Sequence, residues 1–312
     1  MSVKTNLYMN NLSQDVSIGP SPAVWAFQGV PGGGIAEMNQ NAGFGRYAME
    51  QFTGFPSLGA YPLAGAFQGG AKDWAVYAYA GTTLSDAAQE GGGLTIANST
   101  TSQGAAFESN SSSFQFMKSD GTLREYMVFE WGGSVSTITA SQGDMFVGLT
   151  DCQPGTAKPI TTTAGTMASN INFFGFQRVS TTGNDWSVVW QKSGQTAVYP
   201  TGLQTLVTTA LGAAMTAGQF IKLGFIFDPT PANNQVYVYN PSTGQTQGTF
   251  RRPLVKFFVN NLVLPTFLTI DNLVTANFPV VPMGRCFAFM SNSGGTVTMT
   301  NNFIGAAQVA TY

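Results

Sequence analysis

The sequence predicts an all-β protein built as an antiparallel sandwich of two sheets. Three observations predict this class: many short runs of β-branched and aromatic residues, turn signals between those runs, and few segments with helical periodicity. No alternation of strands with helices is visible, so a parallel α/β sheet is not expected. The helical candidates are Leu203–Met215 and the poorer Ala36–Phe52, which Gly43 and Gly45 interrupt.

The expected strands begin near residue 71 and continue to the end of the chain. The first is Trp74–Tyr79, which Gly81 closes. Alternation is clearest in Ile221–Phe227, where apolar residues at every second position share one face, and in Trp186–Trp190. The other expected strands are Leu123–Trp131, Met145–Leu149, Phe173–Phe176, Val236–Tyr239, Phe267–Ile270, Cys286–Met290 and Val297–Met299. Gly, Pro, Asn and Asp clusters between these runs mark the turns.

Residues 1–70 have a different pattern, in which Gly and Pro recur at short intervals between single aromatic residues. Aromatic side chains need a surface against which to bury. We interpret this segment as an extended, irregular arm that lies on the rest of the chain or on a neighbouring subunit, with an ordinary N-terminal subdomain as the alternative. Residues 71–312 then form the sandwich. The candidate interface residues of the arm are Trp25, Phe27, Phe44, Tyr47, Phe52, Phe55, Tyr61 and Phe67.

The composition of the 312-residue chain excludes several function classes. It has no histidine, which excludes Ser-His-Asp and Cys-His nucleophile systems and His-ligated zinc. A net charge of −2, with 9 % charged residues, gives no basic footprint for nucleic acid. No apolar stretch approaches the roughly 18 residues of a membrane helix, and the N-terminal residues lack the apolar run of a secretory signal. We therefore expect no enzyme, cofactor or metal, and neither a nucleic acid nor a membrane as partner.

Two cysteines, Cys152 and Cys286, allow at most one disulfide. Their separation in sequence does not show whether they meet. We expect buried free thiols, because the chain has the composition of a protein assembled in a reducing cytoplasm.

Acidic residues are the remaining candidates for catalysis or metal binding. Glu125 and Glu130 lie on one expected strand, but residues five apart point to opposite faces, so they do not form the carboxylate pair of a glycosidase. Isolated strand carboxylates are the alternative. Aspartates at strand ends would suit Ca²⁺, although no EF-hand-like loop is present, and turn formation is the preferred interpretation of Asp185 and Asp228. The full set is Asp144, Asp151, Asp185, Asp228 and Asp271.

Two further patterns have both a functional and a structural interpretation. Exposed Trp131, Trp186 or Trp190 would stack on sugar rings, but the face that contains Trp186, Val188 and Trp190 has the spacing of a core stripe, which is the preferred interpretation. Gly32–Gly34 and Gly91–Gly93 are not followed by Lys-Ser/Thr, so they do not form a phosphate-binding loop.

The order of strands and turns resembles that of concanavalin-like (laminin-G-like) jelly rolls over residues 71–312. The resemblance lies in a series of strand motifs and in the closing strand. They are Leu123–Trp131, Asp144–Asp151, Phe173–Arg178, Asp185–Val189, Phe220–Asp228, Val236–Asn240 and Asn302–Ala307. The resemblance implies the fold but no catalytic residues. The histidine of the lectin metal loop and the Glu-x-Asp-x-(x)-Glu motif of laminarinase-like members are both missing from this sequence.

Proteins of this kind recur among virion components of tailed bacteriophages. The resemblance, the scarcity of charge and the irregular arm lead us to expect a structural virion protein, a capsid decoration (cement) protein that stabilises the shell by interfacial burial. Its partners would be the major capsid protein or other virion subunits, and copies of itself in a closed oligomer such as a trimer. It would be assembled in the host cytoplasm and located in the virion. The alternative is a carbohydrate-binding adhesin of a tail or fibre, with a glycan as partner, and a glycan hydrolase is the third hypothesis.

Overall fold

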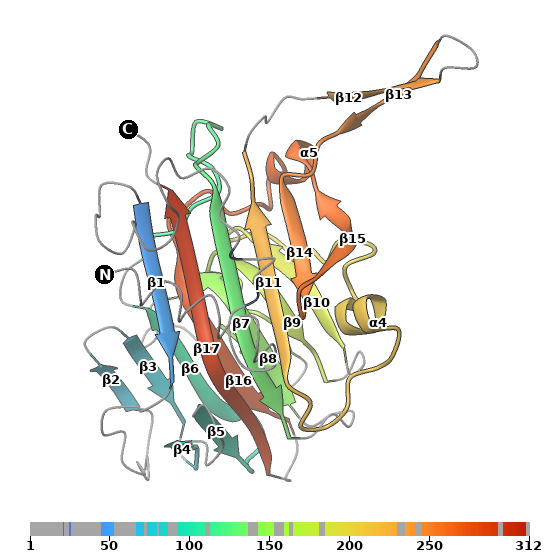
Figure 1. Cartoon of the computed structure of the whole chain (residues 1–312). Helices are drawn as coiled ribbons and strands as arrows, with labels where there is room; N and C mark the ends of the chain where they lie inside the picture. The colour runs from blue at the N-terminus through green and yellow to red at the C-terminus, as the bar shows by residue number, and fades with distance from the viewer. Residues whose placement is uncertain are drawn as a thin grey trace, which may run out of the picture.

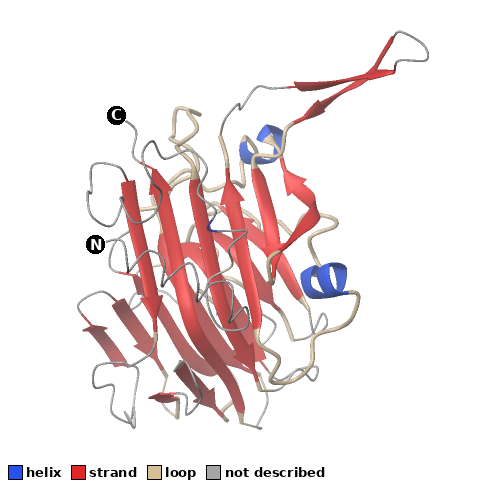
Figure 2. Cartoon of the chain, viewed as in Figure 1, coloured by secondary structure: helices blue, strands red, loops and turns tan. Residues whose placement is uncertain are grey.

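Two antiparallel β-sheets packed face to face make up most of the chain (Figure 1). The computed structural model describes residues 21, 25, 45–52, 67–71, 74–79, 81–86, 93–109, 113–136, 143–152, 159–161, 165–180, 185–229, 235–240, 245–292 and 296–309. Strands dominate the described residues, and the helices α4 (Leu206–Leu211) and α5 (Ile270–Leu273) lie at one side of the sandwich (Figure 2).

The first sheet has eight strands, and its longest strand, β17, pairs with three others. Its order is β15-β14-β11-β7-β17-β5-β4, and β1 pairs with the C-terminal half of β17. The strands are β1 (Gly45–Gln51), β4 (Thr83–Asp86), β5 (Leu94–Asn98), β7 (Met127–Val135), β11 (Ile221–Phe227), β14 (Val255–Val259), β15 (Leu262–Leu268) and β17 (Val297–Val309). The outer strand on one side is therefore β15.

The second sheet has seven strands in the order β10-β9-β8-β16-β6-β3-β2. They are β2 (Phe67–Ala71), β3 (Trp74–Ala78), β6 (Gln103–Ser109), β8 (Gly143–Thr150), β9 (Phe173–Arg178), β10 (Trp186–Gln191) and β16 (Gly284–Ser291). β10 is the outer strand here, as β15 is in the first sheet.

A two-stranded hairpin, β12 (Gln235–Asn240) and β13 (Gln245–Arg251), forms a sheet of its own. It is inserted between β11 and β14 and extends away from the sandwich (Figure 1). Neither of its strands pairs with a described strand other than the other one.

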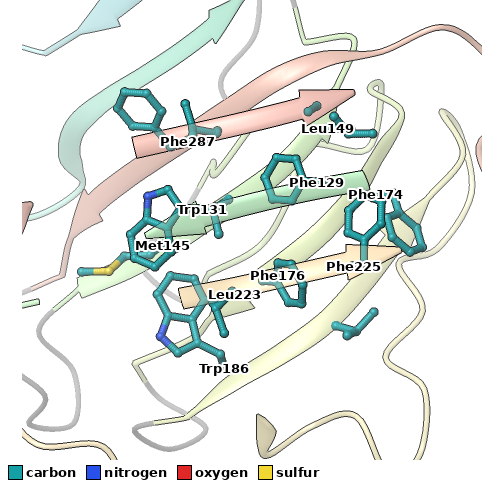
Figure 3. Close-up of a cluster of buried hydrophobic side chains, with 14 of the residues drawn as sticks. Phe129, Trp131, Met145, Leu149, Phe174, Phe176, Trp186, Leu223, Phe225 and Phe287 are labelled. Atoms are coloured by element: carbon teal, nitrogen blue, oxygen red, sulfur yellow. The ribbon is translucent and has the colours of Figure 1, made fainter. Parts of the chain in front are cut away.

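Aromatic side chains fill the space between the two sheets (Figure 3). Phe225 of β11 is the centre of this layer. Its ring stacks on Phe129 of the neighbouring strand with centroids 5.2 Å apart, and meets Phe174 of the opposite sheet edge-on at 5.0 Å. All three rings are fully buried. Every second residue of these strands points inward, so the alternation in the sequence becomes the contact between the sheets.

The predicted fold class, an all-β antiparallel sandwich of two sheets, is confirmed. Several strands were missed. β6 lies in a polar stretch rich in Ser, Thr and Gln, and β14 has a short apolar run without a preceding turn signal. The strand expected at Phe267–Ile270 is instead the end of β15 followed by α5, because Thr269 caps a helical turn together with Asn272.

Of the two predicted helices, one is confirmed in shortened form and one is wrong. α4 occupies the middle of Leu203–Met215 and ends at Gly212, whose φ of 70° is the left-handed C-cap conformation. The prediction for Ala36–Phe52 fails because Gly45–Gln51 forms β1, which pairs along its whole length with β17. Pairing in the sheet overrides the weak helical pattern.

The described part of the N-terminal segment lies on the sandwich of its own chain. β1 and β2, both expected in the arm, are members of the first and second sheets. Trp25 packs on the outer face of the first sheet with Tyr47, ring centroids 6.1 Å apart. The sheets therefore include residues on both sides of the expected boundary at residue 70.

The aromatic layer makes a direct prediction for stability. Replacing Phe225 with Ala leaves a cavity between the sheets and should lower the free energy of unfolding by about 3–5 kcal/mol. Replacing Phe267, which is 40 % exposed, should cost less than about 1 kcal/mol. Urea denaturation followed by tryptophan fluorescence measures both, and equal losses in the two variants would contradict the assigned core.

Candidate binding site

A cleft of about 460 Å³ opens where the outer strands of the two sheets, β10 and β15, lie at the same side of the sandwich. One wall comes from β10 and the loop after it, which returns to pair with Trp190 through Val198. The other wall comes from the end of β15, from α5 and from the turn after it. The lining residues are Trp190, Val198, Pro200, Thr201, Thr266, Phe267, Leu268, Asn272, Thr275 and Asn277.

The polar groups of the cleft are amides and hydroxyls, and none of its lining residues is charged. Asn272 accepts a hydrogen bond from the Thr269 amide through Oδ1 (2.9 Å), which fixes the start of α5. Asn277 donates from Nδ2 to the Thr196 carbonyl (2.7 Å) and so joins the two walls. The remaining atoms, Nδ2 of Asn272 and Oδ1 of Asn277, have no hydrogen bond to other described residues and are available to a ligand.

Aromatic surface is also available in the cleft. Phe267 is 40 % exposed although it is a large apolar residue. At the base, Trp190 is buried against Phe174 and Phe278, and its indole N–H has no hydrogen-bond partner in the described part of the chain. The cleft thus combines an apolar face with neutral donors and acceptors, as small-molecule sites do.

The outer face of the second sheet, by contrast, is covered. Ile160, Met167 and Ile171 come from the connection between β8 and β9 and pack with Phe146 and Phe173 in a second apolar cluster. These residues cover the part of the outer face formed by β8 and β9.

The tryptophans proposed for sugar stacking are core residues. Trp131 and Trp186 are fully buried, and their ring centroids are 5.4 Å apart. The Trp131 indole N–H donates a hydrogen bond to Asn301 Oδ1 (2.8 Å). Neither side chain is free to stack on a sugar, because both point into the layer between the sheets, and the preferred interpretation of Trp186 as part of a core stripe is confirmed. Trp190 is also buried but reaches the cleft.

The two glutamates of interest do not form a carboxylate pair in an open groove. β7 begins at Met127, so Glu125 lies before the strand. Glu130 is buried on the outer face of the first sheet, and its Oε2 accepts hydrogen bonds from the Ser21 amide (2.8 Å) and the Trp25 indole (2.6 Å). Burial raises the pKa of Glu130 to about 7, and these two hydrogen bonds oppose the rise. Its role is to hold the N-terminal segment on the sheet.

The aspartates proposed for calcium have structural partners instead. Asp185 accepts from the Val207 and Thr208 amides at the start of α4, and from its own neighbour Trp186. Asp144 and Asp151 likewise accept from backbone amides, at Ser180 and Asn172. Asp271 lies in the first turn of α5. No group of three or more His, Cys, Asp or Glu side chains suited to a metal occurs within the described residues.

Both cysteines are buried and free, as expected, and they belong to the cluster on the outer face of the second sheet. Burial raises the pKa of each thiol, and the proximity of the Glu108 carboxyl raises both further. Glu108 pairs across the sheet with Cys286 and is itself buried. Burial and the nearby Asp151 raise the pKa of Glu108 to about 9. These thiols lack the positive surroundings of a reactive cysteine.

The candidate interface residues of the arm have varied positions. Phe52 is buried in the main core, with ring centroids 5.5 Å from Phe287 and 6.3 Å from Trp74. Trp25 and Tyr47 are partly buried on the first sheet, and Phe67 is the first residue of β2. Phe27, Phe44, Phe55 and Tyr61 lie outside the described residues. Contact of this set with another subunit stays a prediction.

Comparisons with known proteins return similar folds but no family. No family model and no curated protein matches the sequence. Among solved structures, peanut lectin is similar at 11 % identity and a TM-score of 0.45, covering 86 % of this chain and all of that one. The carbohydrate recognition domain of Emp47p is similar at 12 % identity and a TM-score of 0.46, covering 86 % of this chain and 99 % of that one. The transglycosylase Crh5 is similar at 9 % identity and a TM-score of 0.43, covering 85 % of each chain.

The fold assignment rests on this chain's own strand pairing. A helix of the length and apolarity that a membrane crossing requires is not found in the described part.

Sequence reasoning missed the cleft. Its residues come from two segments that are at least 65 positions apart in the sequence, and the strand pattern that includes Phe267 does not show whether its ring is exposed. The signals that were present are the Thr-rich and Asn-rich turns around α5 and an apolar outer strand that contains a proline, Pro265.

The buried acids predict how stability depends on pH. The pKa of Glu108 in the folded protein, about 9, lies above its unfolded value of 4.5, so the folded state binds more protons between these values. Stability should therefore fall as the pH rises through that window, and Glu130 adds to the fall up to about pH 7. In Glu108→Gln the fall between about pH 5 and about pH 8.5 should be smaller.

Urea denaturation at the two pH values measures this effect. Asp120→Asn is the control, because the Asp120 carboxyl is exposed and its pKa is lowered by the Thr122 amide, so it stays ionised at both pH values. An unchanged pH dependence in Glu108→Gln would contradict the assignment.

Proposed function

We propose that the chain is a carbohydrate-binding protein and that the cleft between β10 and β15 binds a neutral saccharide. The observation that carries the proposal is the lining of this cleft, an exposed Phe267 beside amides and hydroxyls with no charged side chain. A sugar ring has an apolar face of C–H groups and a rim of hydroxyls. The first packs on an aromatic ring, and the second exchanges hydrogen bonds with amide and hydroxyl groups.

The volume and polarity of the cleft also favour this ligand class. A cleft of about 460 Å³ is within the range of small-ligand sites, and it suits one or two sugar units better than a long polymer. A phosphorylated or carboxylated ligand would need a cation, and no lining residue supplies one. Binding without catalysis follows from the same lining, since it offers no carboxyl group as acid, base or nucleophile.

Two substitutions test the cleft. Phe267→Ala removes the stacking surface and Asn277→Ala removes a free acceptor, so each should weaken binding of a neutral oligosaccharide at least about tenfold. A glycan array of neutral oligosaccharides identifies a binder, and isothermal titration calorimetry then compares the variants with the wild type.

Lys256→Ala is the control, because Lys256 is exposed on the neighbouring strand β14 and lies neither in the cleft nor among the exposed apolar residues of β15. It should bind as the wild type does. An array without any neutral binder, or affinity unchanged in both cleft variants, would overturn the proposal.

The second candidate function is a structural component of a virion, in particular a capsid decoration protein. One observation favours an assembly role, namely the hairpin β12–β13, which extends from the sandwich as an arm (Figure 1). Immunogold labelling of tailed-phage particles that contain this chain tests the location. Label on the capsid would support decoration, label on the fibre would support an adhesin, and unlabelled particles would exclude both positions.

A further inference from the structure

The exposed apolar residues of the described chain gather at one side of the sandwich. The large hydrophobic residues with the highest exposure are Tyr199, Leu262, Val263, Phe267 and Val274. Leu262, Val263 and Phe267 belong to β15, Val274 directly follows α5, and Tyr199 lies in the loop after β10. We call Leu262, Val263, Phe267 and Val274 the β15 patch. Val263 and Val274 are 58 % and 60 % exposed.

The β15 patch lies on an unpaired edge. β15 pairs with β14 on one side, and no described strand pairs with its other side. Helix α4 contacts β15 but leaves Leu262 and Val263 exposed. Edge strands in stable proteins are usually short, charged or covered. This strand has seven residues and no charge; Pro265 alone removes one amide from the edge.

The hairpin is the complementary feature. β12 and β13 pair with each other and with no other described strand, so both outer edges of the hairpin are unpaired. A two-stranded hairpin on its own is marginally stable in water. Its first strand reads Gln-Val-Tyr-Val-Tyr-Asn, a sequence of high β-propensity.

The hairpin and the patch lie at the same side of the molecule (Figure 1). The hairpin connects β11 to β14, and β14 is the strand that pairs with β15. The hairpin points away from its own β15, so the surface that it can cover is one on another molecule. In a closed oligomer, each copy would donate one hairpin and receive one.

We infer that the hairpin β12–β13 of one copy docks on the β15 patch of a second copy of this chain. The contact buries the exposed apolar residues of the β15 patch. It also gives the hairpin a surface to pack on. This inference does not rest on carbohydrate binding, because Leu262, Val263 and Val274 do not line the cleft.

Two variants of the whole chain test the hairpin and the β15 patch separately. In one, Gly-Ser residues replace Gln235–Arg251 and the patch is intact. In the other, Val263→Lys places a charge in the patch and the hairpin is intact. Sedimentation equilibrium should show an oligomer for the wild type and dissociation constants at least about tenfold higher for each variant alone. Thr208→Lys, an exposed position on α4 outside the patch, is the control and should assemble as the wild type does.

Mixing the two variants gives the decisive measurement. One supplies an intact patch and the other an intact hairpin, so the mixture should form a heterodimer that neither forms alone. Circular dichroism establishes that both variants are folded. A monomeric wild type overturns the inference. So does assembly of the hairpin-deleted variant, which would mean a patch-to-patch contact, and so does assembly of Val263→Lys alone, which would mean a contact between hairpins.

Discussion

The packing of aromatic rings between the two sheets is the constraint on which the rest of the structure depends. Phe225, Phe129 and Phe174 fill the centre of the space between the sheets. A sandwich filled in this way must still close at its sides, where the outer strands have no neighbour. At the side of β10 and β15 the aromatic layer ends in Trp190, and the cleft begins beyond it. The candidate site is thus the place where the core meets solvent.

The same constraint explains where the acids are. Because the inner faces are apolar, Glu108, Glu130 and Asp144 lie on the outer faces of the sheets, and other segments of the chain then cover them. Asp144 and Glu130 gain hydrogen bonds from backbone amides in return. For Glu108 burial dominates, so its pKa rises to about 9. Two of the few carboxylates in this chain, those of Asp144 and Glu130, therefore hold covering segments on the outer faces. None of the residues that line the cleft is charged.

Sequence reasoning predicted the fold class because that class depends on local patterns. The alternation in Ile221–Phe227 and Trp186–Trp190 corresponds to strands whose apolar residues face the core. Sequence reasoning failed where pairing between distant segments determines the secondary structure. The segment Gly45–Gln51 is an example, because it forms strand β1 by pairing with β17. The cleft depends on a similar long-range fact, since Phe267 and Val198 meet only when both sheets are complete. Exposure of Phe267 cannot be predicted from its neighbours in sequence, whereas the burial of Trp186 and Trp190 follows from their spacing.

The carbohydrate and assembly proposals meet at one residue. Phe267 lines the cleft and also belongs to the β15 patch. Because the proposed docking of the hairpin buries the β15 patch, a saccharide and a second copy of the chain compete for the Phe267 ring. Each then lowers the apparent affinity of the other by the same factor.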